Sequence, residues 1–236
     1  MNYQNKIILV TGGSRGIGSK IASYFLEKGA KVIVTYHHNK ENIEKLKEKY
    51  SNLEILELDL KNEDSIRNLF MFIKDKYKRI DILINNAAKS LDSFYLDKTK
   101  EEFMEVIETN LIGTFLMIKY FQGIMDKGYI FNMSSTDGID TGSVYSIDYN
   151  ASKAGINMLT KTISLDNHNT IISICPNWVD TDSTRRMYPN YLESELKRIK
   201  QEKLIDESTI PKVIDKCIRE KVKSGSIIRI DGDIDV

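Results

Sequence analysis

The stretch KIILVTGGSRGIGSK, residues 6–20, decides how the rest of the chain is interpreted. Lys6 to Val10 is short, apolar and β-branched, so it predicts a buried strand. Thr11 to Gly18 follows at once, with glycines at 12, 16 and 18, and opens a segment with helical apolar spacing. Glycines between a strand and a helix permit a tight turn and expose backbone N–H groups to an anion. The stretch predicts a dinucleotide site, the alternative being an ordinary strand-to-helix turn.

The same strand and helix pattern recurs along the chain. Apolar β-rich runs predict seven strands: Lys6 to Val10, Lys31 to Tyr36, Leu53 to Leu58, Ile80 to Ile84, Tyr129 to Met133, Ile171 to Cys175 and Ser226 to Ile230. Helical spacing predicts Ile17 to Lys28, Lys40 to Tyr50, Glu63 to Tyr77, Thr99 to Met125, Tyr149 to Leu165, Leu192 to Lys203 and Ile210 to Lys221. Strict alternation implies parallel strands joined by helical crossovers. We expect an α/β fold: a single doubly wound Rossmann-type domain over residues 1–236, with a seven-stranded parallel sheet and helices on both faces.

The composition excludes several kinds of protein. Hydrophobic residues make up 41% of the chain and there are only 3 prolines, which is typical of a globular protein and not of a disordered one. Because 34 Lys and Arg balance 34 Asp and Glu, no overall charge attracts nucleic acid or an anionic membrane. The polar start and the short apolar run Ile7 to Val10 predict no signal peptide or membrane span, hence a cytoplasmic protein. Cys175 and Cys217 lack zinc-ligand spacing, so no metal site is expected.

Several motifs, taken in chain order, resemble the short-chain dehydrogenase/reductase family, and within it 3-oxoacyl-carrier-protein reductase-like members. They are Thr11 to Gly18, Asp59, Asn85-Asn86-Ala87-Ala88, Glu108-Thr109-Asn110-Leu111, Ser135, Tyr149 with Lys153, Pro176 to Thr181 and Ile230-Asp231-Gly232. Because they extend across nearly the whole chain, their joint specificity is high. The resemblance implies a nicotinamide-dependent oxidoreductase.

Three positions depart from the motifs of that family. Ala88 replaces the glycine of NNAG, Asn177 replaces the glycine after Pro176, and Asp233 replaces the last glycine of the closing motif. Asn tolerates a positive φ better than most residues, so we expect the second change to be mild. None of the three removes a group of the expected catalytic set.

Tyr149 and Lys153 are four residues apart at the start of a predicted helix, so their side chains share one face. A phenol titrates near pH 10, and a nearby ammonium favours the phenolate by about 1.4 kcal/mol per unit of pKa shift. The resemblance implies that Tyr149 is the catalytic acid/base and that Lys153 also binds the nicotinamide ribose. Tyr145 is a nearby rival, but only Tyr149 has the lysine partner.

The resemblance also implies two polar residues around this pair. Ser135, after the fifth predicted strand, would polarise the substrate carbonyl oxygen, with Ser134 as its rival. Asn110 would hold a water near Lys153 for proton relay. Both serines could instead be strand-end turn residues, and Asn110 a buried polar residue satisfied locally.

The end of the second predicted strand, Thr35-Tyr36-His37-His38-Asn39, carries no carboxylate of the kind that selects NAD. Similar reductases place the equivalent of Arg15 beside the 2′-phosphate, so we expect NADP(H), with NAD(H) as the alternative. Arg15 and the histidines could instead be plain solvent-facing residues. The residues expected to contact the cofactor are Gly12, Ser14, Arg15, Gly16, Ile17, Gly18, Tyr36, His37, Asp59, Leu60, Asn86, Ala87, Tyr149, Lys153, Pro176, Val179 and Thr181.

The substrate is less well defined by the sequence. Asp182 to Ile205 would form a lid, and aromatic and apolar side chains near it, which include Trp178 and Tyr188, could line the pocket or simply pack. We expect reduction of a ketone or other carbonyl compound, 3-oxoacyl compounds included. The alternatives are an alcohol, sugar or steroid dehydrogenase working oxidatively, and a non-catalytic nucleotide-binding regulatory protein.

The expected partners are a small-molecule carbonyl or alcohol substrate and further copies of the chain. The amphipathic segments Thr99 to Met125 and Tyr149 to Leu165 resemble helices that form interfaces in this family, which implies a homodimer or homotetramer. No nucleic acid and no membrane is expected as a partner.

Overall fold

The strands form one parallel sheet in a computed structural model that describes residues 2–38 and 41–233. Within these residues the sheet has seven strands in the order β3-β2-β1-β4-β5-β6-β7. Their bounds are β1 (Ile7–Val10), β2 (Lys31–Tyr36), β3 (Leu53–Glu57), β4 (Ile82–Asn85), β5 (Tyr129–Met133), β6 (Thr170–Pro176) and β7 (Ile227–Ile230). The chain runs outward from β1 to β3 and then returns to the centre at β4, so the strand order reverses between β1 and β4. The predicted doubly wound parallel sheet is confirmed.

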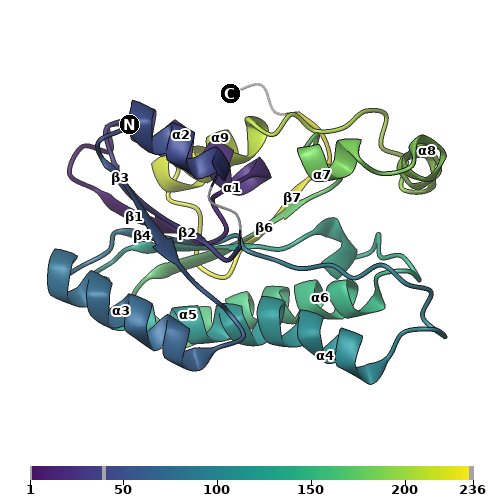
Figure 1. Cartoon of the computed structure of the whole chain (residues 1–236), viewed down its shortest axis with the longest axis horizontal. Helices are drawn as coiled ribbons and strands as arrows, with labels where there is room; N and C mark the ends of the chain where they lie inside the picture. The colour runs from purple at the N-terminus through teal and green to yellow at the C-terminus, as the bar shows by residue number, and fades with distance from the viewer. Residues whose placement is uncertain (1, 39–40, 234–236) are drawn as a thin grey trace.

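Helices cover both faces of the sheet (Figure 1). One layer holds α1 (Gly16–Glu27), α2 (Glu41–Lys49) and α9 (Thr209–Arg219), and the other holds α3 (Glu63–Tyr77), α4 (Lys100–Ile107), α5 (Gly113–Phe121) and α6 (Ile147–Ile163). The short helices α7 (Asp182–Arg185) and α8 (Pro189–Arg198) follow β6 and lie at one end of the molecule, at the right of Figure 1. No helix in the described part of the chain is long and apolar enough to cross a membrane.

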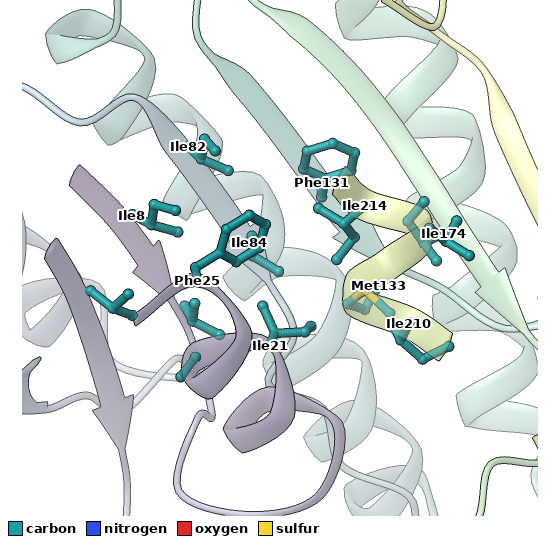
Figure 2. Close-up of a cluster of buried hydrophobic side chains, with 14 of the residues drawn as sticks. Ile8, Ile21, Phe25, Ile82, Ile84, Phe131, Met133, Ile174, Ile210 and Ile214 are labelled. Carbon is teal, nitrogen blue, oxygen red and sulfur yellow. The ribbon is translucent and has the colours of Figure 1, made fainter. Parts of the chain in front are cut away.

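Each face of the sheet packs its own hydrophobic core. Along β1, Ile8 and Val10 belong to the core under α1 and α9, whereas Leu9 belongs to the core under α3 and α5. This alternation follows from the two-residue period of a strand. Because both faces of the sheet are buried, the strands are apolar along their whole length. Figure 2 shows the first core, where Phe25 of α1 and Ile214 of α9 lie over the sheet.

Two predicted helices differ from the observed ones. The segment Thr99 to Met125 is not one regular helix, because the π-helical segment η1 (Glu108–Ile112) separates α4 from α5. The prediction of Leu192 to Lys203 is wrong at both ends, since α8 begins at Pro189, a residue suited to the first helical turn, and ends at Arg198. Lys200 has a φ of 59°, which a helix does not allow. Helix α7 was not among the predicted helices.

Candidate functional site

The glycine loop between β1 and α1 forms a cradle with exposed backbone. Gly12 and Gly16 have φ of 64° and 51°, values that favour glycine. A Cβ on Gly12 would lie 2.8 Å from the Cα of Ala87, so only glycine fits against the loop after β4. Arg15 caps α1 without a side-chain hydrogen bond, which leaves the first N–H groups of the helix without a side-chain acceptor. These features fit the pyrophosphate of a dinucleotide.

Thr11 locks the glycine loop to the loop after β4. Its Oγ1 accepts hydrogen bonds from the backbone N–H groups of Asn86 and Ala87, both at 3.0 Å. The Asn86 amide in turn donates to the carbonyl oxygens of Thr11 and Gly12, at 2.9 and 3.1 Å. These bonds hold the two loops together at the point where strand order reverses, which is where such sheets bind ligands. Thr11 belongs to the expected glycine-loop motif, but its role could not be predicted from the sequence, because its hydroxyl binds residues about 75 positions away.

The end of β2 lies beside the residue that follows β3. His37 Nε2 lies 3.8 Å from Asp59 Oδ2, and the rings of His37 and His38 lie 3.6 Å apart. Both histidines and Arg15 are exposed, whereas Tyr36 and Leu60 are buried. His37 thus lies beside Asp59 at the carboxyl ends of β2 and β3, while Arg15 lies at the start of α1.

The loop after β6 faces the glycine loop. A Cβ on Gly16 would lie 3.7 Å from the Cγ2 of Thr181, while Val179 is buried and pairs with Ile205. Asn177 has no positive φ, so the expected reason for tolerating it in place of glycine does not apply. Its amide accepts a hydrogen bond from the Thr136 hydroxyl and donates one to Asp231 Oδ1 at 3.1 Å. Asn177 therefore ties the loop after β6 to the loop after β5 and to the residue after β7.

Tyr149 and Lys153 lie on one face of α6, with the Lys153 Nζ 5.2 Å from the centroid of the Tyr149 ring. Lys153 is 2% exposed, and its Nζ donates to the carbonyl oxygen of Met133 at 2.7 Å. Burial lowers the pKa of Lys153 to about 8. Burial, with the charge of Asp137 adding to it, raises the pKa of Tyr149 well above its ordinary value. The isolated pair therefore favours a protonated phenol.

The two candidate serines have different surroundings. Ser134 donates its hydroxyl to the carbonyl oxygen of Lys153 at 3.0 Å, which fixes α6 against the end of β5. Ser135 interacts with the Tyr149 phenol, and this hydrogen-bonding contact lowers the phenol pKa. The expected role of Ser135 at the substrate carbonyl stays a prediction. The turn after Ser135 packs closely on α6, because a Cβ on Gly138 would lie 2.5 Å from the backbone carbon of Lys153.

Asn110 is fully buried inside the π-helical segment η1. Its amide nitrogen donates to Lys89 O at 2.8 Å and to Ser152 Oγ at 3.0 Å, and its oxygen accepts from Lys89 N at 2.8 Å. Asn110 thus joins the loop after β4 to α6 just before Lys153. Short π-helical segments occur frequently at functional sites. Its expected role in holding a water near Lys153 stays a prediction.

A buried ion pair next to Tyr149 escaped the sequence analysis. Lys98 Nζ lies 2.9 Å from Asp148 Oδ2, with side-chain exposures of 1% and 0%, and it also donates to the carbonyl oxygen of Leu91. Asp148 Oδ1 accepts the backbone N–H of Tyr149 at 2.8 Å. Only the position of Asp148 directly before Tyr149 was visible in the sequence, since Lys98 is 50 residues away. Asp137, two residues after Ser135, was missed as well.

Comparisons with known proteins give matches along most of the chain. The sequence model of the family described as short chain dehydrogenase matches residues 6–191. The 3-oxoacyl-(acyl-carrier-protein) reductase of Vibrio cholerae serotype O1 is 32% identical over 222 residues, 91% of this chain and 90% of that protein. The acetoacetyl-CoA reductase of Rhizobium meliloti is 32% identical over 215 residues, 89% of this chain and 83% of that protein.

Solved structures share the fold. A dehydrogenase/reductase from Sinorhizobium meliloti 1021 matches with a TM-score of 0.90 and 24% identity, over 98% of this chain and 95% of that one. The Pseudomonas aeruginosa RhlG/NADP active-site complex matches with a TM-score of 0.89 and 24% identity, over 98% of this chain and 96% of that one. At this identity the likeness extends to the architecture alone.

Proposed function

Because the chain belongs to the short-chain dehydrogenase/reductase family and is an NAD(P)-dependent oxidoreductase, we propose that it reduces a ketone or other carbonyl compound with NADPH. The names of its relatives make 3-oxoacyl thioesters the first substrates to test. The single observation that carries the proposal is the placement of Tyr149. The Lys153 Nζ lies 5.2 Å from its ring, Ser135 is beside it, and the pair lies at the same edge of the sheet as the glycine cradle.

In the proposed reaction, the carbonyl oxygen of the substrate lies between Ser135 and Tyr149. The bound nicotinamide supplies the hydride that adds to the carbonyl carbon. The Ser135 hydroxyl donates a hydrogen bond to the oxygen as negative charge develops there. Tyr149 transfers its phenolic proton to that oxygen, which completes a secondary alcohol. The phenolate that remains is stabilised by the ammonium form of Lys153, and the proton is replaced from solvent.

The residues that would hold the cofactor lie at the same edge of the sheet. The N-terminus of α1 and the glycine loop would bind the pyrophosphate, and Asp59 would lie by the adenine. Arg15 and His37 would bind a 2′-phosphate, since both are exposed cationic or ionisable groups and strand β2 ends without a carboxylate. This supports NADP(H) over NAD(H). Thr181 and Val179 would lie over the nicotinamide.

We also propose that residues 1–236 act as one cytoplasmic domain that assembles into a homodimer or homotetramer. Exposed apolar side chains on the outer side of the helices favour self-association: Met104, Ile112, Phe115 and Met158. Light scattering of the purified chain would give the mass of the assembly directly.

Tyr149→Phe tests the proposed function. The variant keeps the ring but has no proton to donate, so we expect it to bind NADPH normally and to lose at least 99% of carbonyl reduction. A panel of ketones and 3-oxoacyl thioesters, followed by NADPH absorbance, measures turnover, and NADPH fluorescence measures binding. Tyr145→Phe is the matched control and should keep its activity. Full turnover by Tyr149→Phe would disprove the assignment, and an inactive wild-type chain that still binds NADPH would favour the regulatory alternative.

Arg15→Ala tests the cofactor preference. Loss of a charge-assisted contact to the 2′-phosphate should raise the Kd for NADPH about 10-fold, while the Kd for NADH changes little, because NADH has no such phosphate. Fluorescence titration with each cofactor gives both constants. Arg67→Ala, a similarly exposed arginine on α3, serves as the control. Equal weakening of both cofactors would remove the case for the phosphate contact.

A further inference from the structure

A buried ion pair lies directly behind the first turn of α6. Lys98, in the segment 89–98 between β4 and α4, has its Nζ 2.9 Å from Oδ2 of Asp148, and the two side chains are 1% and 0% exposed. The removal of two charges from water costs free energy, and apolar residues of similar volume often stabilise a fold equally well or better. A contribution to folding therefore does not explain why these two charges lie at this place.

The carboxylate of Asp148 also binds the backbone of the next residue. Its Oδ1 accepts the N–H of Tyr149 at 2.8 Å, and this N–H belongs to the first turn of α6, where the helix itself offers no acceptor. Ser146, at the N-cap, makes no side-chain hydrogen bond to the helix. Lys98 in turn holds the carboxylate and donates to the carbonyl oxygen of Leu91. The backbone of Tyr149 is thus tied to the loop after β4 through Asp148.

Two further contacts join the same segment to the residues on either side of this turn. The backbone N–H of Ser93 donates to the carbonyl oxygen of Tyr145 at 3.0 Å. Asn110, whose amide is bonded to the backbone of Lys89, donates to Ser152 Oγ at 3.0 Å. Helix α4, into which the segment leads, lies in the same layer as α6 (Figure 1). The segment is therefore connected to the chain before, at and after the position of the expected proton donor.

We propose that Asp148, held by Lys98, is a positioning residue that fixes the backbone of Tyr149 and so sets the distance over which the phenol transfers its proton. This inference rests on the proposed function and adds to it the pair that places the proton donor. Because both side chains of the pair are buried, neither touches substrate or cofactor. A misplacement of a reacting group by about 1 Å costs about 100-fold in rate, so a small shift of the first turn of α6 is enough for a measurable loss.

Two double variants test the hydrogen bond to Tyr149 without leaving a buried charge. Lys98→Met/Asp148→Asn keeps a side-chain oxygen that can accept the N–H of Tyr149, whereas Lys98→Met/Asp148→Leu has a similar shape and no acceptor. For ketone reduction with NADPH, we expect the leucine variant to lose about 10-fold in kcat and the asparagine variant to stay within about threefold of the wild type. KM and the Kd for NADPH should change little in either variant, because proton transfer, and not binding, is disturbed.

Urea unfolding separates this positioning role from a purely structural one. Apolar side chains replace a buried ion pair at little cost in stability, whereas a buried amide must find hydrogen bonds for all of its polar atoms. The leucine variant should therefore be at least as stable as the asparagine variant, although its kcat is lower. A purely structural role of the pair does not give a variant that is equally stable and clearly less active.

Lys6 and Asp81 provide a matched control at the opposite edge of the sheet. Lys6 Nζ lies 2.8 Å from Asp81 Oδ1, and Asp81 Oδ2 accepts the backbone N–H of Ile7 at 2.9 Å, so this pair has the same pattern of bonds. It lies at the amino ends of β1 and β4, whereas the candidate site lies at the carboxyl ends. Lys6→Met/Asp81→Leu should therefore leave kcat unchanged.

Two results with folded proteins would overturn the inference. One is an equal kcat in the leucine and asparagine variants. The other is a loss of activity in both, since catalysis would then need the charges and not the hydrogen bond. If the leucine variant does not fold, Lys98→Met/Asp148→Ala, which also lacks an acceptor, takes its place and should lose kcat in the same way. Failure of both to fold would show that the pair is needed for folding, which would overturn the inference as well.

The outcomes also distinguish the inference from the function on which it rests. Activity that survives Tyr149→Phe removes the proposed function, whatever the Asp148 variants do. If activity requires Tyr149 but the leucine and asparagine variants have the same kcat, the proposed function stands and only the positioning role of Asp148 is removed.

Discussion

Burial acts in opposite directions on the two ionisable groups of α6. It raises the pKa of Tyr149 above its ordinary value and lowers that of Lys153 to about 8, because in each case the uncharged form is easier to bury. The isolated pair is therefore closer to neutral than the two model compounds would be. Below pH 8 the phenol of Tyr149 is neutral and Lys153 is still charged, which suits a tyrosine that donates its proton beside an ammonium group.

The burial of Lys153 predicts a free energy of unfolding that depends on pH. Below pH 8 the folded chain carries a charged, buried Lys153, and between pH 8 and its ordinary pKa of about 10.5 the unfolded chain binds more protons than the folded one. The contribution of Lys153 to stability therefore rises with pH through that window. Relative to Lys153→Met, which has no such group, the wild-type chain should gain about 2 kcal/mol between pH 7 and pH 9.5.

Urea unfolding of both proteins at the two pH values measures this difference. Lys161→Met, on the exposed side of the same helix, is the control and should track the wild type. A gap between wild type and Lys153→Met that stays constant with pH would show that Lys153 keeps its ordinary pKa in the folded chain.

At the scale of elements, the ion pair between Lys98 and Asp148 holds the loop after β4 to the start of α6. Both side chains are almost fully buried, so their attraction is weakly screened, but their desolvation is also costly. The pair is placed to hold the first turn of α6, since Asp148 also binds the backbone N–H of Tyr149. Such a pair contributes little net free energy of folding, and its main effect is to fix the geometry of the first turn of α6.

Lys98→Met should lower the free energy of unfolding by about 3–5 kcal/mol, because it leaves Asp148 buried without its partner. Adding Asp148→Asn should recover part of the loss, since the uncompensated charge is gone. Urea unfolding of the single and double variants gives the coupling energy. Lys61→Met, which breaks the half-exposed pair with Glu105, should change stability by no more than about 1 kcal/mol. If Lys98→Met also changed the free energy of unfolding by no more than about 1 kcal/mol, water would have to reach Asp148 and solvate its charge.

One helix that the sequence predicts, Thr99 to Met125, is interrupted in the structure. Apolar spacing from Thr99 to Met125 predicts one helix, and the side chains do follow it through α4 and α5. Asn110 lies in the π-helical segment between them, and its partners Lys89 and Ser152 lie in other elements. A local periodicity contains no information on these partners, so the interruption was not predictable.

At the scale of the whole molecule, the reversal of strand order between β1 and β4 brings the site together. The carboxyl ends of β1, β4, β5 and β6 are neighbours in the sheet, and their loops carry Gly12, Asn86, Ser135 and Thr181. Because all strands are parallel, every one of these loops leaves from the same edge. The residues of the expected site are thus close in space although they are far apart in the sequence.

The amino-acid sequence by itself determined the alternation of strands and helices, the glycine loop and the face shared by Tyr149 and Lys153, because all three depend on neighbours within a few residues. It also determined the family, through motifs whose order is fixed along the chain. Only the tertiary structure decided that Lys98 pairs with Asp148, that Ser134 donates to the carbonyl oxygen of Lys153, and that Asn110 binds Lys89 and Ser152. These are contacts between separate elements, and their energies come from desolvation and hydrogen bonds that exist only once the elements are packed.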